Sequence, residues 1–174
     1  MRARLKAVLG RLLETVVVTL VLGLTAVVVI AVIYRKAGAS LSWYDEIASI
    51  LLAWVTYYGA ALAALRRQHI GFDGIVRAVS PAWRVAFVVV SEIAVFGFFG
   101  LLAWTGWVVL EVLAGDTLVS LPSISVQITQ SVIPIGAVLF IICEAVSLPD
   151  YWRDLTEGTG VEAPPDPAAG ESET

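Results

Sequence analysis

Four long stretches of this chain have almost no charged side chains in their interiors, and this pattern limits the possible folds more than any other feature. A helix needs roughly 20 residues to cross a hydrocarbon core about 30 Å thick, and each stretch is long enough. With 59% hydrophobic and 15% charged residues, the 174-residue chain also has more apolar surface than a soluble domain of this size can bury. We therefore predict an all-α integral membrane domain over residues 1–157, with transmembrane helices at about 12–34, 46–66, 84–112 and 123–148.

The first apolar stretch has one alternative interpretation, a secretory signal that is cleaved after export. Basic residues precede it, and Ala37-Gly38-Ala39 follows it with the small side chains of a cleavage site. However, the apolar run is too long for a signal sequence, and Arg35 and Lys36 stand directly before the proposed cut. We therefore predict a retained membrane helix.

Residues 158–174 have a different composition from the rest of the chain. They contain three prolines, three glycines and almost no large apolar side chain. Such a segment cannot bury enough surface to offset the entropy of ordering it. We predict a disordered cytoplasmic tail.

The lysines and arginines near the ends of the apolar stretches predict the orientation in the membrane. If the N-terminus is cytoplasmic, the cytoplasm receives nine basic residues and the periplasm receives only Arg35 and Lys36. Lys and Arg are enriched in cytoplasmic connections, so both termini are predicted to lie inside. The cytoplasmic connection between the second and third helices is predicted to hold a short amphipathic helix, with an apolar face of Phe72, Ile75, Val76 and Val79.

The second apolar helix carries charges at both ends. Asp45 and Glu46 fall in its first turn, where carboxylates interact favourably with the positive end of the helix dipole. Arg66, Arg67 and His69 stand at its other end, beside the cytoplasmic headgroups. These charges are enough to orient the helix. The alternative is that Asp45 and Glu46 also contact a partner protein at the periplasmic face.

Small residues recur four apart along the same helix, at Gly59 and Ala63 and again at Ala60 and Ala64. Such a strip lets a second helix approach closely, which is a main source of helix association in lipid. Two interpretations remain open. The strip can pack against another helix of this chain, or it can dock a second membrane protein.

Two further residues interrupt the apolar pattern. Glu92 is the one carboxylate well inside a predicted span, and the other three spans offer no matching central charge. We therefore expect Glu92 to make a structural polar contact, with ion coupling as the alternative. Pro134, followed by Gly136, is expected to kink the fourth helix, with neighbouring helices satisfying the freed carbonyl.

The residue inventory argues against catalysis. His69 is the single histidine and Cys143 the single cysteine, and neither is placed with a plausible base or nucleophile. No metal site, cofactor or nucleic-acid partner is expected. A self-sufficient transporter is disfavoured because the chain shows no internal repeat. An accessory subunit that binds a larger membrane protein remains.

Two motifs then resemble a known family. The second helix opens with Trp43-Tyr44-Asp45-Glu46 and contains Trp54 and Gly59, and Arg66-Arg67-Gln68-His69-Ile70-Gly71-Phe72-Asp73 follows it. This arrangement resembles the DctQ-type small subunit of tripartite ATP-independent periplasmic (TRAP) transporters. In that family, a tryptophan followed by two acidic residues opens the second helix, and a His-Ile-x-(Val/Phe)-Asp motif comes just after it. One departure is Asp45, where glutamate is common.

The resemblance implies a three-part importer in the bacterial inner membrane. A periplasmic binding protein delivers an organic acid to a large membrane subunit, which uses a sodium gradient, while the small subunit supports the large one and holds no cofactor. The residues implied at the interfaces with the two partners are Trp43, Asp45, Glu46, Trp54, Gly59, Ala63, Arg66, Arg67, His69 and Asp73. The alternative is the small four-span subunit of a tripartite tricarboxylate transporter, or another membrane scaffold protein.

Overall fold

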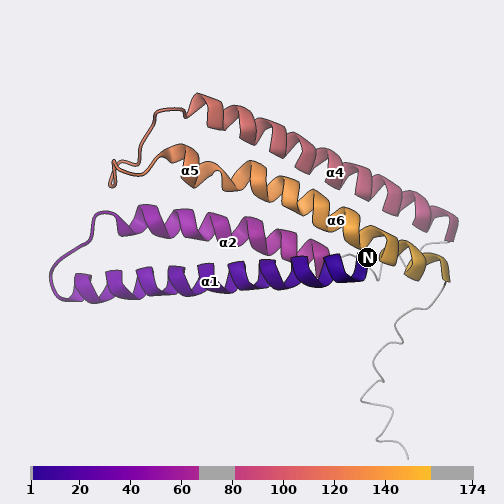
Figure 1. The fold of residues 1–174 in the computed structure, drawn as a ribbon, viewed down its shortest axis with the longest axis horizontal. Coiled ribbons are helices and arrows are strands. Elements are labelled where there is room, and N and C mark those ends of the chain that lie inside the picture. The colour runs from indigo at the N-terminus through magenta and orange to yellow at the C-terminus, as the bar shows by residue number, and fades with distance from the viewer. Residues whose placement is uncertain (1, 67–80, 158–174) are drawn as a thin grey trace, which may run out of the picture.

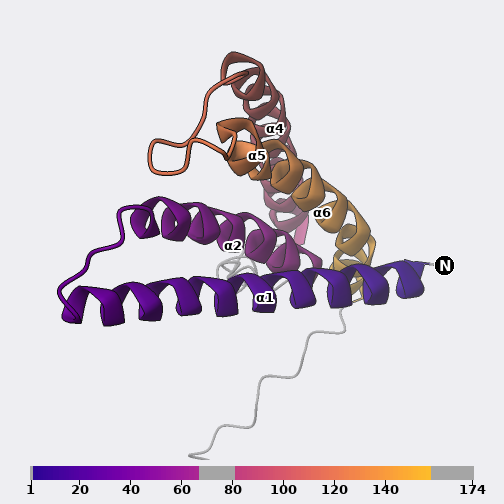
Figure 2. The same ribbon diagram turned by 60° about the vertical axis from the view of Figure 1, so that its left-hand side comes forward.

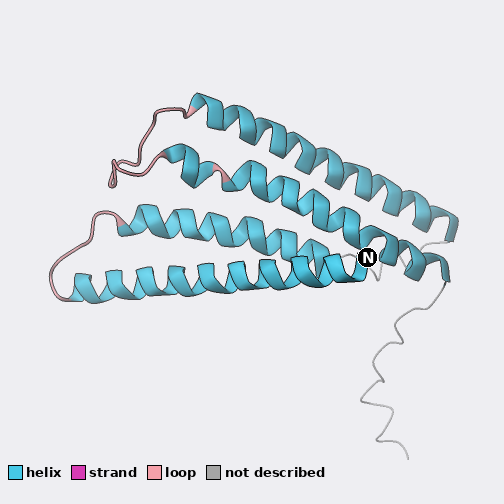
Figure 3. Ribbon diagram, viewed as in Figure 1, coloured by secondary structure: helices cyan, strands magenta, loops and turns pink. Residues whose placement is uncertain are grey.

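The computed structural model describes residues 2–66 and 81–157, and this part of the chain is almost entirely helical (Figure 3). Its elements are α1 (Arg2–Lys36), α2 (Tyr44–Arg66), α4 (Pro81–Val112), α5 (Val126–Gln130) and α6 (Val132–Glu157). Four segments are long and apolar enough to cross a membrane, the last of them formed by α5 and α6 together. The predicted all-α fold with four membrane spans is therefore confirmed.

The helices pack as a row rather than as a closed bundle. α1 packs on α2, α2 packs on α6, and α6 packs on α4, whereas α1 reaches α6 only slightly. Figures 1 and 2 show this arrangement from two directions. A row leaves large parts of its outer helices without a neighbour from the same chain.

Successive long helices run in opposite directions, so their ends collect at two ends of the row. The connections 37–43 and 113–125 lie at one end, which we call the outer end (Figure 1). The start of α1 and the end of α6 lie at the opposite, inner end. Figure 2 shows the α1–α2 pair and the α4–α6 pair spread apart at the outer end and converging toward the inner end.

The end of α1 explains the small residues that resemble a cleavage site. Gly38 has a φ of 83°, a left-handed conformation that glycine adopts readily. The Ala39 N–H donates to the Tyr34 carbonyl at 3.0 Å, and the Gly38 N–H donates to the Arg35 carbonyl at 3.2 Å. This pair of hydrogen bonds is the Schellman arrangement that ends helices. The pattern therefore serves a turn between α1 and α2.

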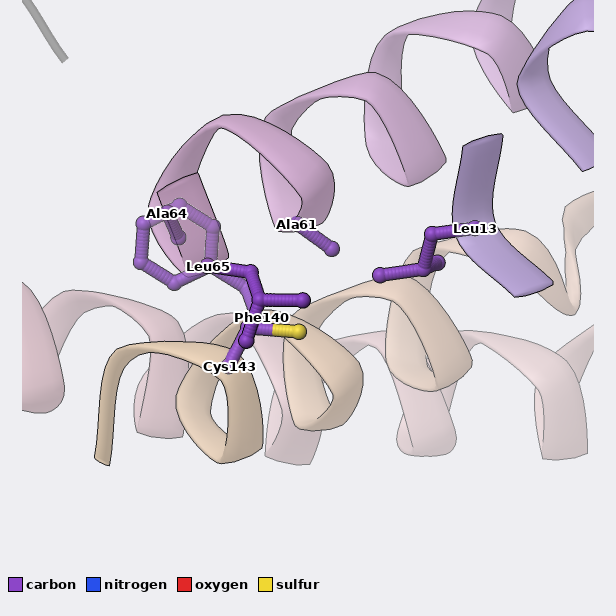
Figure 4. Packing of buried hydrophobic residues seen from close by; sticks show 6 residues of the cluster. All are labelled: Leu13, Ala61, Ala64, Leu65, Phe140 and Cys143. Atoms are coloured by element: carbon purple, nitrogen blue, oxygen red, sulfur yellow. The ribbon is translucent and has the colours of Figure 1, made fainter. Parts of the chain in front are cut away.

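The buried core lies near the inner end, where α1, α2 and α6 meet. Its members are Leu13 of α1, three residues of α2, and two residues of α6 (Figure 4). Phe99 of α4 joins them, because its ring stacks on Phe140 with centroids 3.6 Å apart. The residues shown in Figure 4 are Leu13, Ala61, Ala64, Leu65, Phe140 and Cys143. α2 and α6 are the two inner helices of the row, and we call α6, which is the more buried of the two, the central helix.

The fourth span is divided into two helices at Ser131, three residues before Pro134. α5 ends at Gln130 and α6 begins at Val132, with a turn at Ser131 between them. Pro134 has no N–H, and its ring crowds the carbonyl four residues earlier, which belongs to Gln130. Regular helical bonding therefore cannot run through this point. Pro134 itself stands in the first turn of α6, and a second proline, Pro149, lies further along the helix.

Two other predictions fall on residues outside the described part of the chain. They are the amphipathic helix expected around residues 72–79 and the disordered tail at 158–174. Both stay predictions.

Candidate functional site

Glu46 fastens the second outer connection to the start of α2. Its carboxylate accepts the Val119 N–H at 3.2 Å and the Ser120 N–H at 2.9 Å. The Ser120 hydroxyl adds a bond to the Ser42 carbonyl at 3.2 Å. We call these four residues the outer clamp. The clamp satisfies two loop N–H groups with one carboxylate, and it joins segments more than 70 residues apart in the sequence.

Asp45 is not part of the outer clamp. Its side chain is exposed, while that of Glu46 is partly buried. The helix begins at Tyr44, and the first backbone bond runs from the Ile47 N–H to the Trp43 carbonyl at 3.2 Å. The sequence predicts the same role for Asp45 and Glu46 in the first turn of the helix, but the structure gives their side chains different surroundings. Glu46 binds its own chain, and Asp45 faces outward.

The connection 113–125 has a defined fold of its own. The Val126 N–H donates to the Asp116 carbonyl at 3.0 Å, and the Gln127 side-chain amide donates to the Leu110 carbonyl at 2.8 Å. The second bond satisfies a carbonyl in the last turn of α4, where helical partners are missing. Together with the clamp, these bonds fix the position of Val119, whose side chain is 92% exposed.

Trp54 joins α2 to the interrupted span. Its indole Nε1–H donates to the Thr129 carbonyl at 2.9 Å, two residues before the turn at Ser131. Its ring also meets the Tyr58 ring edge to face, with centroids 6.3 Å apart. The bonded carbonyl is the neighbour of the Gln130 carbonyl that Pro134 crowds, so the expectation that a neighbouring helix satisfies the freed carbonyl stays a prediction.

α6 meets both of its neighbours at glycines. A Cβ placed on Gly136 would lie 2.7 Å from the Tyr57 Cβ of α2, closer than real contacts allow. A Cβ on Gly106 of α4 would lie 3.0 Å from both Ile133 and Pro134. Around Pro134, α6 therefore approaches both α2 and α4 closely, as small residues permit in lipid.

The small-residue strip of α2 is divided between two sides of the helix. Of the strip, Ala64 is fully buried in the core, beside the equally buried Ala61. By contrast, a Cβ on Gly59 would find no atom within 4 Å, and Ala63 is only partly buried. The chain uses one side of the strip for its own packing. It leaves the Gly59 side open.

Ion pairs tie the helices together at the inner end. The Arg66 guanidinium lies 2.9 Å from the Glu14 carboxylate of α1, and the Lys6 ammonium lies 2.7 Å from the Asp150 carboxylate of α6. Arg66, one of the residues implied at the partner interface, thus has a bond within its own chain. Three others implied there lie outside the described residues, namely Arg67, His69 and Asp73.

The sequence reasoning missed Glu144, a second carboxylate within the apolar part of the chain. Glu144 is only 5% exposed, and Glu92 is partly buried. Because α4 and α6 are antiparallel and Phe99 lies opposite Phe140, Glu92 lies at the level of Ser147, one turn from Glu144. The expectation that the other spans offer no matching central charge did not take this carboxylate into account. The predicted fourth stretch ran to residue 148 and already contained Glu144.

The described residues show contacts between helices and loops rather than a constellation for chemistry. Among them, no group of three or more His, Cys, Asp or Glu side chains is placed to hold a metal ion. Cys143 is fully buried in the core, where it packs as a small apolar side chain.

Comparison with known proteins identifies the family. No curated protein matches the chain. A family model does match, and its description is the DctQ component of tripartite ATP-independent periplasmic transporters. The match covers residues 24–155, which is well over half of the chain and includes α2, α4, α5 and nearly all of α6. The chain therefore belongs to the DctQ family, the small membrane subunits of TRAP transporters.

Proposed function

We propose that this chain pairs with the large membrane subunit of a TRAP transporter in the bacterial inner membrane and supports it as a non-catalytic partner. The complex takes up an organic acid, which a periplasmic binding protein delivers, and a sodium gradient drives the uptake. The family match over residues 24–155 is the observation that carries this proposal.

The open row of helices supports a scaffolding role. Outer faces of α1 and α4 carry large apolar side chains without neighbours from this chain, such as Leu22 at 65% exposed and Trp104 at 71%. Lipid or a second membrane protein must cover such faces. A closed bundle would leave less surface for a partner than this row does.

Within the proposal, the Gly59 side of α2 contacts the large subunit. The opposite side of the helix is occupied, because Ala61 and Ala64 pack in the core. Gly59 and Ala63 lie one turn apart, with open space at the glycine. A helix of the partner can approach there as closely as α6 approaches α2 at Gly136.

The outer end faces the binding protein. Two residues are exposed there: Val119, which belongs to the outer clamp, and Asp45, which precedes the clamp residue Glu46. Glu46 has a positioning role, because it holds the connection that carries Val119. Asp45 supplies a charge for direct contact.

Uptake by reconstituted liposomes tests the proposed function. Sodium-driven accumulation of the substrate is expected when this chain, the large subunit and the binding protein are all present. Omitting any one of the three abolishes it. Uptake by this chain alone, or full uptake without it, would contradict the proposal.

Co-purification tests the proposed interface. Gly59→Leu places a large side chain in the open space and is expected to reduce recovery of the large subunit, while the chain itself stays folded. Gly23→Leu is the matched control, because a Cβ on Gly23 of α1 also meets no atom within 4 Å. Equal recovery with both variants would remove Gly59 from the interface.

A further inference from the structure

A groove opens between α1 and α2 at the inner end of the row. It has a volume of about 240 Å³ and lies beside the Arg66–Glu14 ion pair. The residues that line it include Lys6, Gly10, Arg11 and Glu14 of α1 and Leu65 and Arg66 of α2.

The rim of the groove carries an excess of positive charge. Three cationic side chains line it against one carboxylate, that of Glu14, which is already 2.9 Å from Arg66. Lys6 has its own partner in Asp150. Arg11 is exposed, and no described acidic residue pairs with it. Its guanidinium therefore remains available for an anion.

The floor of the groove is apolar. Leu65 is only 1% exposed, and its Cδ2 lies 3.6 Å from where a Cβ on Gly10 would stand. The missing side chain at Gly10 therefore keeps the floor open. A cationic rim above an apolar floor matches a ligand with a charged head and a hydrocarbon chain.

The groove also lies at the depth of the lipid headgroups. Arg66 is the last residue of α2, and Arg11 stands just before the uncharged run that begins at Thr15. With the predicted orientation, this end faces the cytoplasm, where basic pockets between membrane helices take up anionic headgroups. We propose that the groove binds one anionic phospholipid, with its phosphate on Arg11 and an acyl chain over Gly10, above the buried Leu65. This inference goes beyond the proposed function, because it needs neither partner protein.

Native mass spectrometry of the full chain in detergent tests the site with phosphatidylglycerol and phosphatidylcholine as probes. Phosphatidylglycerol is expected to bind more tightly, and Arg11→Gln to weaken that binding about fivefold, as expected for one basic side chain at an anionic surface. Arg4→Gln is the matched control, since Arg4 is exposed on the same helix but does not line the groove. It should leave binding unchanged.

A second pair of variants tests the apolar floor. Gly10→Leu fills the groove without removing charge and is expected to weaken phosphatidylglycerol binding, whereas Gly23→Leu has no effect. An excess of inorganic phosphate should not displace the lipid. Equal binding of the two lipids, equal loss with Arg4→Gln and Arg11→Gln, or displacement by phosphate would each overturn the proposal.

Discussion

α1 and α6 differ in a way that separates hydrophobicity from burial. α1 contains the most apolar window of the four spans, yet only 6% of that window is buried within the chain. The window of the last span is less apolar, and 44% of it is buried. In water the most apolar helix would be the most buried one. Here lipid covers apolar side chains, so hydrophobicity does not select the central helix.

The feature that allows α6 to be buried between two helices is its set of small side chains. The buried positions of α6 include Gly136, Ala137, Cys143 and Ser147. The glycine lets α2 approach α6 closely, as the contact between Gly136 and Tyr57 shows, and Gly106 does the same on the side of α4. Van der Waals packing at short range then stabilises the row, because apolar contact alone gains little over lipid tails. Substitutions in α6 should therefore cost more than similar ones in the outer helices.

Loss of the Phe140 ring is the largest effect expected. Phe140→Ala removes the stack on Phe99 and leaves a cavity in the core, which should cost about 3 kcal/mol of unfolding free energy. The matched change on an outer helix is Phe87→Ala, since Phe87 of α4 is 57% exposed. Unfolding in detergent, followed by circular dichroism, measures both. Similar losses for the two variants would break the contrast between central and outer helices.

Adding one methyl group at the α2–α6 contact is expected to have the next largest effect on stability. In Gly136→Ala the new Cβ would lie 2.7 Å from the Tyr57 Cβ, so the helices must separate, at a cost of about 2 kcal/mol. Gly97→Ala on α4 meets no atom within 4 Å and should instead gain up to about 1 kcal/mol from helix propensity. The two melting temperatures are expected to shift in opposite directions. A rise in melting temperature for both variants would mean that α2 and α6 are not in close contact.

Removing one hydrogen bond between α2 and the interrupted span should have a smaller effect. Trp54→Phe keeps an aromatic ring beside Tyr58 but loses the donor to the Thr129 carbonyl, which should cost about 1 kcal/mol. Trp104→Phe changes an exposed indole on α4 and serves as the control. Chemical denaturation resolves a difference of this size. If Trp104→Phe proved the more damaging, α4 would not be an outer helix.

The smallest effect is expected at the inner end of α1. Arg66→Gln breaks the ion pair with Glu14, but both side chains are about half exposed, at 42% and 53%. Exposed pairs contribute less than about 1 kcal/mol, and high salt weakens them further. The melting temperature should therefore fall slightly at low salt and not at high salt. A large fall in the melting temperature of Arg66→Gln at high salt would show that the contact between α1 and α2 contributes more to stability than the low burial of α1 indicates.

Much of the fold follows from the sequence because lipid imposes simple rules. Charge-poor runs of sufficient length mark the four spans, and the structure confirms them. The order of the row does not follow from these runs. It depends on contacts such as Gly136 with Tyr57, which join residues about 80 positions apart and leave no periodic signal in the sequence.

The candidate site was also predicted only in part, because its contacts join residues that are far apart in the sequence. The Trp-acidic-acidic motif located the start of α2, and Trp54 does contact another span. The different roles of Asp45 and Glu46 depend on where the 113–125 connection folds, which local sequence does not specify. Glu144 was overlooked because it directly follows the uncharged run that ends at Cys143. An acidic residue at such a boundary is exposed or buried according to tertiary packing.

Labelling of single cysteines in intact bacterial cells tests the central claim, that four helices cross the membrane with both ends of the chain in the cytoplasm. In a Cys143→Ser background, a maleimide that cannot cross the membrane should react with Val119→Cys before permeabilisation. Leu5→Cys and Arg153→Cys should react only after it. Both Val119 and Leu5 are exposed in the folded chain, so burial does not limit either reaction. Labelling of Leu5→Cys and Arg153→Cys from opposite sides of the membrane would contradict the account.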